Sequence, residues 1–176
     1  MPIRPALIGY RATGKTTVGS MLADRMGVPW IDTDAEIVER AGCSIAEIFA
    51  ERGEAAFRDL ESQVVKDVTQ RPDVVLSFGG GAILRPENRQ HIIDRCQPIV
   101  WLQAKVETIY QRIYQDAASA SQRPNLTSQG GMEEIRTVLS QRLPLYESCA
   151  TISLDTETHS LESLVEAIVT HLDPPT

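Results

Sequence analysis

Residues 9–16 read Gly9-Tyr10-Arg11-Ala12-Thr13-Gly14-Lys15-Thr16 and fit the pattern G-x-x-x-x-G-K-[ST]. The apolar run at residues 6–8 before this stretch is typical of a short buried strand, and an amphipathic helical pattern follows Lys15. The backbone N–H groups of such a loop can wrap a polyphosphate, and the new helix N-terminus adds positive potential. The stretch therefore predicts binding of a nucleoside triphosphate, with Lys15 at the terminal phosphates and the Thr16 hydroxyl on Mg²⁺. The alternative is an ordinary glycine turn.

Short apolar runs alternate with helical patterns along the rest of the chain. The runs lie at residues 6–9, 28–31, 74–78, 99–102 and 151–154. Gly27 is expected to end the first helix, Ser44-x-x-Glu47 is a capping box, and Ser160 is expected to begin the last helix. This alternation predicts an α/β fold in which helices cover both faces of a parallel sheet. Ligands of such folds bind beyond the C-terminal ends of the strands.

Size and composition favour one domain over residues 1–176 of ordinary globular composition. The net charge of −7 argues against a nucleic-acid partner, and neither a membrane-spanning run nor a signal-peptide pattern occurs. The cysteines are odd in number and far apart, which predicts free thiols in a reducing cytoplasm: Cys43, Cys96 and Cys149. The histidines lie near no motif and are interpreted as surface or structural residues: His91, His159 and His171.

Two carboxylates follow the second apolar run, in Asp32-Thr33-Asp34. On an extended segment, side chains two residues apart point the same way, and like charges there need cations or donors opposite. Beside a nucleotide they would hold the waters of Mg²⁺ and accept a proton from a substrate hydroxyl. The alternative is that Asp34 only caps a helix over residues 35–40.

A single arginine, Arg58, lies one helical turn after Glu54 and one turn before Glu61. These carboxylates could hold its guanidinium in one orientation, which suits bidentate binding of a substrate carboxylate. The alternative is a solvated helix with exposed charge pairs.

Three consecutive glycines, Gly79, Gly80 and Gly81, follow the third apolar run. Three glycines are entropically costly, whereas a turn needs one or two. They indicate close approach of the backbone to a ligand, with N–H groups free to donate. A plain turn is the alternative.

Two further arginines complete the set of candidates. Arg123 lies in the polar, small-residue stretch 116–131, which is typical of a mobile loop. A cation there could close over the phosphates and exclude water. Arg142 is expected at a helix end, where the helix dipole alone would explain a cation.

These motifs, in their order along roughly residues 5–155, resemble those of shikimate kinases. The matching motifs are Gly9-x-x-x-x-Gly14-Lys15-Thr16, Asp32-Thr-Asp34, Ser44-Ile45-x-Glu47-Ile48-Phe49, Gly53-Glu54-x-x-Phe57-Arg58-x-x-Glu61, Gly79-Gly80-Gly81, Arg123-Pro124 and Arg142-x-x-x-Tyr146. The resemblance implies a P-loop fold of the nucleoside monophosphate kinase type, with a five-stranded parallel sheet flanked by helices. It places a substrate-binding region at about residues 33–61 and a lid at about residues 113–131.

The resemblance implies a cytoplasmic enzyme of chorismate and aromatic amino acid biosynthesis, expected to be a monomer, which phosphorylates the 3-hydroxyl of shikimate with ATP and Mg²⁺. It assigns the ATP phosphates to Ala12, Thr13, Gly14, Lys15, Thr16 and Thr17. Thr16 would ligate the metal, and Asp32 would assist through water. Arg123 would be the lid arginine that contacts ATP, and Arg112 matches a position that often packs on adenine.

For the acceptor, the resemblance implies that Asp34 holds the reacting hydroxyl and is the candidate base. Arg58 and Arg142 would clamp the carboxylate, and the backbone of the three glycines would bind ring hydroxyls. Lys15, Asp34 and Arg123 are therefore the expected catalytic residues.

Three departures from the family pattern and three alternatives remain. The stretch from Arg112 to Arg123 is a few residues longer than in many members, and the loop at residues 155–159 lacks the arginine that some members place beside ATP. Ala12 stands where family loops often have glycine, but the general loop pattern does not require it, so nucleotide binding is expected to survive. A gluconate kinase should lack the combination of Arg58, three glycines and Arg142. A P-loop GTPase would need an Asn/Thr-Lys-x-Asp motif, which does not occur. An idle nucleotide-binding module would have no need of Lys15, Asp34 and Arg123.

Overall fold

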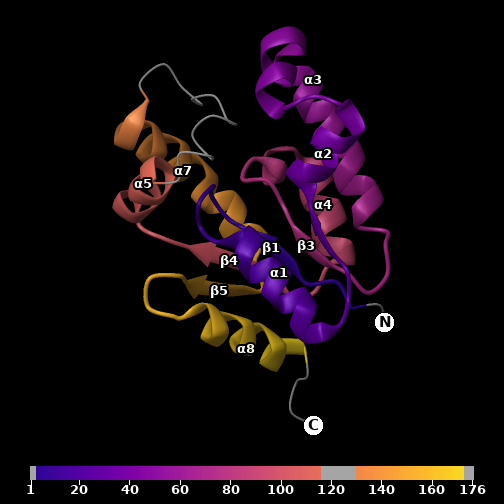
Figure 1. Ribbon diagram of the computed structural model, residues 1–176, viewed down its shortest axis with the longest axis vertical. Helices are drawn as coiled ribbons and strands as arrows, with labels where there is room; N and C mark the ends of the chain where they lie inside the picture. The colour runs from indigo at the N-terminus through magenta and orange to yellow at the C-terminus, as the bar shows by residue number, and fades with distance from the viewer. Residues whose placement is uncertain (1–2, 116–129, 173–176) are drawn as a thin grey trace.

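Five parallel strands form one sheet in the order β2-β3-β1-β4-β5 (Figure 1). The computed structural model describes residues 3–115 and 130–172. The strands are β1 Ala6–Ile8, β2 Trp30–Asp32, β3 Val75–Ser77, β4 Ile99–Gln103 and β5 Ile152–Asp155. Each predicted apolar run therefore overlaps a strand, but β2 begins two residues later than expected, and β2, β4 and β5 each end one residue beyond the predicted run.

Helices connect the strands and carry the caps that the sequence predicts. They are α1 Lys15–Met26, α2 Thr33–Ala41, α3 Ile45–Val68, α4 Pro86–Arg95, α5 Val106–Gln115, α7 Gly131–Cys149 and α8 Leu161–Leu172, with a 3-10 turn η1 at Ala82–Leu84. Gly27 ends α1 with a φ of 67°, and the Ser44–Glu47 capping box begins α3. Gly53 interrupts α3 with a φ of 79°. Among the described residues, no helix combines the length and the apolar character that crossing a membrane requires.

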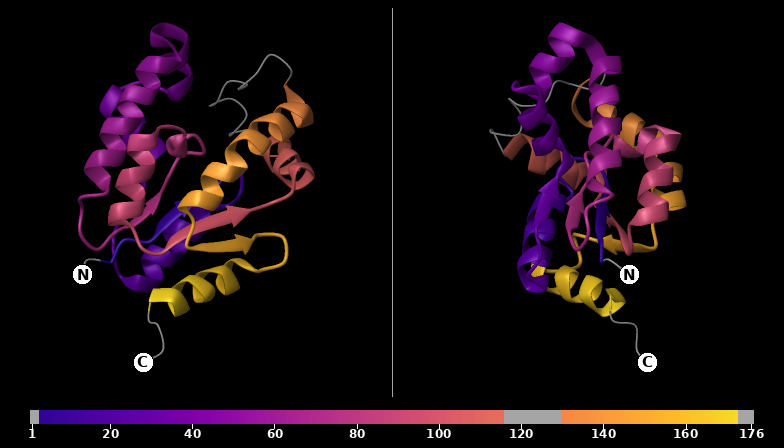
Figure 2. Two further views of the ribbon diagram at one scale, coloured as in Figure 1. Left: turned by 180° about the vertical axis from the view of Figure 1, so that it is seen from behind. Right: turned by 90° about the vertical axis from the view of Figure 1, so that its right-hand side faces the viewer.

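The two faces of the sheet are covered by different helices (Figure 2). Because side chains alternate along a strand, Leu7 packs with α1 and α8, whereas Ala6 and Ile8 pack with α3, α4 and α7. All three of these side chains are buried. The predicted α/β fold with helices on both faces is confirmed.

The strand order reverses at β1, since β3 and β2 lie on one side of it and β4 and β5 on the other. The loop at residues 9–14 therefore leaves the sheet at its switch point, where open α/β folds bind ligands. Helices α2 and α3 rise beyond the strand ends on one side of this loop, and α5 and α7 on the other (Figures 1 and 2). The residues predicted to bind ligands come from these segments.

Candidate active site

The loop between β1 and α1 folds around the ammonium group of Lys15. Its Nζ donates to the carbonyl oxygens of Gly9 at 2.9 Å and Tyr10 at 2.7 Å. Gly14 adopts a left-handed φ of 96° at the N-cap of α1, so the first N–H groups of that helix face the loop. The arrangement has the cation and backbone donors that an anion site needs.

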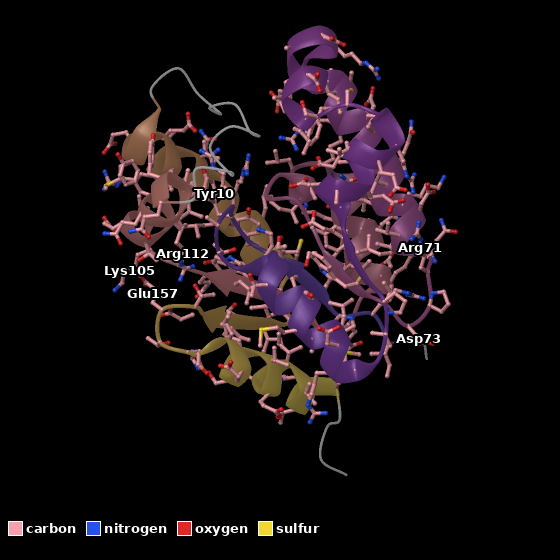
Figure 3. All side chains as sticks on the ribbon, viewed as in Figure 1. Tyr10, Arg71, Asp73, Lys105, Arg112 and Glu157 are labelled. Carbon is pink, nitrogen blue, oxygen red and sulfur yellow. The ribbon has the colours of Figure 1, made fainter. Side chains whose placement is uncertain are left out.

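Ala12 adopts a φ of 61°, in the left-handed region that favours glycine. A residue with a Cβ there is strained by about 1 kcal/mol or more, which gives a physical reason for a glycine at this position. The carbonyl of Ala12 accepts a hydrogen bond from Arg112 Nη1 at 3.2 Å, and the same nitrogen donates to Thr156 at 3.1 Å. Arg112 thus joins α5 to the phosphate loop and to the end of β5 (Figure 3).

Asp32 and Asp34 do not lie together on an extended segment, as the sequence suggested, because the chain turns into α2 at Thr33. Asp32 is the N-cap, and its Oδ1 accepts from the N–H groups of Asp34 at 2.9 Å and Ala35 at 3.4 Å. The interpretation of Asp34 as the cap was therefore wrong. The second oxygen of Asp32 accepts from the Thr16 hydroxyl at 3.1 Å. A hydroxyl and a carboxylate, the ligand types suited to Mg²⁺, thus meet beside the loop.

Two of the three glycines, Gly79 and Gly81, occupy positions where a larger residue would collide with the site. A Cβ on Gly79 would fall within 3.0 Å of Asp34 Oδ1, and one on Gly81 within 3.0 Å of the Arg58 guanidinium. The plain-turn alternative does not account for this crowding. The N–H of Gly79 is not free, however, because it donates to the Thr33 hydroxyl at 3.0 Å. Binding of a ligand by the glycine backbone stays a prediction.

Arg58 is held by carboxylates on both sides, as expected. Its Nη1 donates to Glu61 at 2.8 Å, and its Nε and Nη2 lie 3.4 and 3.3 Å from Glu54. The Arg58 and Glu61 side chains are buried, so the alternative of exposed charge pairs was wrong. Burial raises the pKa of Glu61 above its usual value, although the neighbouring Arg58 guanidinium acts in the opposite direction.

Arg142 lies inside α7 and not at a helix end, because α7 continues past Pro144 to Cys149. The helix dipole therefore does not explain this buried cation. Its guanidinium lies 5.8 Å from the centre of the Tyr10 ring. One turn later, the Tyr146 hydroxyl donates to the Gly80 carbonyl at 2.6 Å, and burial raises the pKa of Tyr146 to about 12. This bond ties α7 to the glycine segment.

Two pockets meet at Asp34. The acceptor pocket contains Asp34, Arg58, Glu61, Arg142 and the three glycines, with an apolar wall of Ile45, Phe49 and Phe57. The phosphate pocket contains Ala12, Gly14, Lys15, Thr16, Thr17, Asp32, Asp34 and Arg112. The predicted residues that the structure describes thus line these two pockets, except Thr13, which lines a neighbouring pocket with Gly14 and Thr17. Arg123 lies outside the described residues together with most of the expected lid.

Sequence reasoning missed several residues of this region. Phe49 and Phe57 belong to the quoted motifs, but an apolar residue at helical spacing gives no sign that it faces a pocket. Thr33 and Arg11 carried no pattern of their own. His159, interpreted only as a surface or structural residue, is exposed and lines a third pocket together with Thr13, Thr17 and Arg112.

The phosphate loop at the head of α1, beside a pocket with two buried arginines and a carboxylate, defines a P-loop kinase that acts on a small molecule. The model of the shikimate kinase family matches residues 11–173. The chain belongs to the shikimate kinase family, and its activity is the ATP-dependent phosphorylation of shikimate in aromatic amino acid biosynthesis.

Individual relatives agree with this assignment. The chain is 39% identical to the shikimate kinase of Rhodopirellula baltica over 93% of this chain and 87% of that protein. It is 44% identical to that of Nitratidesulfovibrio vulgaris, over 84% and 83% of the two chains. Among solved structures, shikimate kinase from Acinetobacter baumannii in complex with shikimate matches with a TM-score of 0.89 and 34% identity, covering 98% of this chain and 93% of that one.

A gluconokinase from Sinorhizobium meliloti shares the fold only, with a TM-score of 0.58 and 16% identity, covering 98% of this chain and 93% of that one. The gluconate kinase alternative loses its support, since the high-identity relatives are shikimate kinases.

Proposed function

We propose that the two pockets align the 3-hydroxyl of shikimate with the γ-phosphate of ATP, and that Asp34 holds this hydroxyl. The observation that carries the proposal is the position of Asp34, which lines both pockets. Its site in the first turn of α2 gives the carboxylate the favourable end of a helix dipole.

The acceptor pocket suits a carboxylated ring with hydroxyl groups. Arg58 and Arg142 supply two cations from α3 and α7, and both are buried, so their forks can bind a carboxylate with little competition from water. Phe49 and Phe57, whose ring centres lie 4.8 Å apart, offer an apolar wall for the ring. Shikimate has this combination of carboxylate, ring and hydroxyls.

The phosphate pocket would hold the nucleotide through the loop backbone and Lys15. Lys15 now bonds to carbonyl groups of its own loop, and a bound phosphate would offer its Nζ a charged acceptor instead. Thr16 and Asp32 fit Mg²⁺, which needs few protein ligands because phosphate oxygens and water complete its shell. Bound there, the metal would neutralise phosphate charge.

The reaction needs positioning more than covalent chemistry. The hydroxyl oxygen forms a bond to the γ-phosphorus, the bond from that phosphorus to the bridging oxygen of ADP breaks, and the hydroxyl proton passes to the Asp34 carboxylate. Asp34 first orients the 3-hydroxyl group. It then accepts the hydroxyl proton as the hydroxyl oxygen bonds to the γ-phosphorus.

Other parts of the proposal rest on the sequence. Arg123 would contact ATP from the lid. A cytoplasmic location is supported by three free thiols, at Cys43, Cys96 and Cys149. The chain is proposed to act as a monomer.

An ADP-release assay with ATP, Mg²⁺ and a panel of acceptors tests the function. The panel consists of shikimate, quinate, gluconate and a nucleoside monophosphate. We expect turnover with shikimate that disappears when Mg²⁺ is chelated, and identification of the product as shikimate 3-phosphate by mass and NMR. Turnover with gluconate alone would overturn the proposal.

A further inference from the structure

Three residues line both the acceptor pocket and the phosphate pocket: Arg11, Asp34 and Ile45. The phosphoryl group is the part of the substrates that passes from one pocket to the other. A side chain that borders both pockets therefore borders its path. Asp34 would repel an anionic group and Ile45 is apolar, which leaves Arg11 as the one member of the three with a complementary charge.

Arg11 is held in place by a buried carboxylate. Its Nη2 lies 3.2 Å from Glu134 Oε1, in the first turn of α7, and the exposed fractions of the two side chains are 16% and 1%. The guanidinium also lies 5.9 Å from the centre of the Tyr10 ring. An ion pair with a carboxylate so well removed from water restricts where the guanidinium can lie.

The pair with Glu134 leaves part of the Arg11 guanidinium available. A guanidinium carries five N–H donors, and the bond to Glu134 uses one of them. Among the described residues, the buried Nε has no hydrogen-bond partner. The buried Nε is not exposed to either pocket, so a ligand would be met by the terminal nitrogens of this oriented cation.

The geometry separates Arg11 from the two arginines assigned to the carboxylate. Arg58 and Arg142 line the acceptor pocket and not the phosphate pocket, whereas Lys15 lines the phosphate pocket and not the acceptor pocket. Arg11 alone among these cations borders both. Charge on the oxygens of a transferring phosphoryl group is stabilised by cations fixed before the reaction.

We infer that Arg11 is a further catalytic residue, which donates to the oxygens of the phosphoryl group during transfer, and that Glu134 is its positioning residue. The inference rests on the proposed function. It extends the phosphate loop's task from holding the nucleotide to stabilising the group in transit.

The test compares Arg11→Met, Glu134→Gln and the double variant with the wild-type enzyme. Arg11→Met keeps the length of the side chain and removes its charge, and we expect kcat to fall about 100-fold. The Kd of ADP and the Kd of shikimate should each stay within about threefold, because the contact forms in the transition state. The ternary complex of ADP, aluminium fluoride and shikimate, which mimics the transferring group, should weaken by about the same factor as kcat.

The double variant guards against misfolding, since Arg11→Met alone removes a charged partner from a buried carboxylate. It should fold and show the same loss of kcat. Glu134→Gln retains an acceptor for Arg11 but loses the charge, and should lower kcat about tenfold with unchanged Kd values. Arg25→Met is the matched control, because Arg25 forms an exposed ion pair with Glu166 at the far end of α1 and should keep wild-type kinetics.

Each outcome separates this inference from the proposed function. If a folded double variant keeps wild-type kcat, Arg11 has no role in transfer. A rise in the Kd of shikimate at unchanged kcat would make Arg11 a third carboxylate contact and would also overturn the inference. If the wild-type enzyme itself does not phosphorylate shikimate, the proposed function is refuted, and the role of Arg11 that rests on it is refuted with it.

Discussion

Arg58 Nη1 donates to Glu61 Oε2 at 2.8 Å, and 11% and 2% of the two side chains are exposed. A buried ion pair of this kind adds little to stability, because desolvation offsets most of the attraction. Its consequence is orientation: with Glu61 on one side and Glu54 on the other, the guanidinium has a restricted set of positions. The pair therefore prepares Arg58 for a ligand before the ligand arrives.

Replacing either buried arginine by lysine should weaken shikimate binding more than ATP binding. In Arg58→Lys and in Arg142→Lys, a point charge replaces a planar fork and cannot form two parallel hydrogen bonds to a carboxylate. Loss of one charge-assisted bond corresponds to about 2 kcal/mol, so the KM for shikimate should rise roughly 10- to 100-fold. Steady-state kinetics with each substrate varied in turn measure this. Arg71→Lys, in an exposed ion pair with Glu36, is the control, and wild-type shikimate kinetics in both site variants would refute the clamp.

Glu61→Gln should change how both stability and substrate binding depend on pH. The folded-state pKa of Glu61 is raised above its usual 4.5, so the folded protein binds this proton more tightly than the unfolded chain does. The contribution of Glu61 to the free energy of unfolding is therefore greatest below pH 4.5 and is lost as the pH rises through the folded-state pKa. Urea denaturation across this window should show that loss in the wild-type protein and not in Glu61→Gln.

Substrate binding should depend on pH in the opposite direction: the Glu61 contribution to stability is lost as the pH rises, whereas shikimate binding should weaken as the pH falls. Protonation of Glu61 weakens its hold on Arg58, so the KM for shikimate should rise as the pH falls through the raised pKa. In Glu61→Gln this acid limb should disappear. Glu54→Gln is the matched control, because Glu54 contacts the same arginine from an exposed position. Parallel pH profiles for wild type and Glu61→Gln would contradict the assignment.

The sequence was sufficient to predict the sheet and the clustering of most candidate site residues, because both depend on local patterns. Buried parallel strands are short apolar runs, and the phosphate loop carries its own backbone requirement in Gly14 and Lys15. The spacing of Glu54, Arg58 and Glu61 predicted their contacts, since one helix carries all three.

Features that depend on tertiary contacts could not be read from these patterns. The sequence left open, as an alternative, that Asp34 only caps a helix, and the backbone turn at Thr33 instead makes Asp32 the N-cap. Arg142 was expected at a helix end, yet α7 accommodates Pro144 and continues to Cys149. The contact between Arg11 and Glu134 joins residues 123 positions apart, and no local sequence pattern predicts it.

Gly79→Ala should impair catalysis at little cost in stability. The new Cβ would fall within 3.0 Å of Asp34 Oδ1, and a carboxylate end can move aside. A displacement of about 1 Å at a reacting group can lower kcat roughly 100-fold, while the KM for ATP should change little. Gly27→Ala is the matched control: its left-handed φ of 67° strains alanine by about 1 kcal/mol, but no atom is nearby, so only the free energy of unfolding should fall. Wild-type kcat in Gly79→Ala would show that Asp34 tolerates displacement.

Asp32, the N-cap of α2, and Asp34, in the first turn of α2, should respond differently to the same change. Asp34→Asn removes the proposed base and should lower kcat by about 100- to 10,000-fold while ATP still binds. Asp32→Asn keeps a good N-cap for α2 but loses the charge beside Thr16. We therefore expect it to fold normally and to need about tenfold more Mg²⁺ for half-maximal activity.

Titration of ATP into each variant by calorimetry, and activity against Mg²⁺ concentration, separate these roles. If Asp34→Asn no longer bound ATP, its function would lie in the phosphate pocket and not at the acceptor hydroxyl. If Asp32→Asn lost kcat at saturating Mg²⁺ as severely as Asp34→Asn, the division between a metal-supporting and a proton-accepting carboxylate would fail. The division follows from geometry, because Asp32 lines the phosphate pocket only, whereas Asp34 also borders the acceptor pocket.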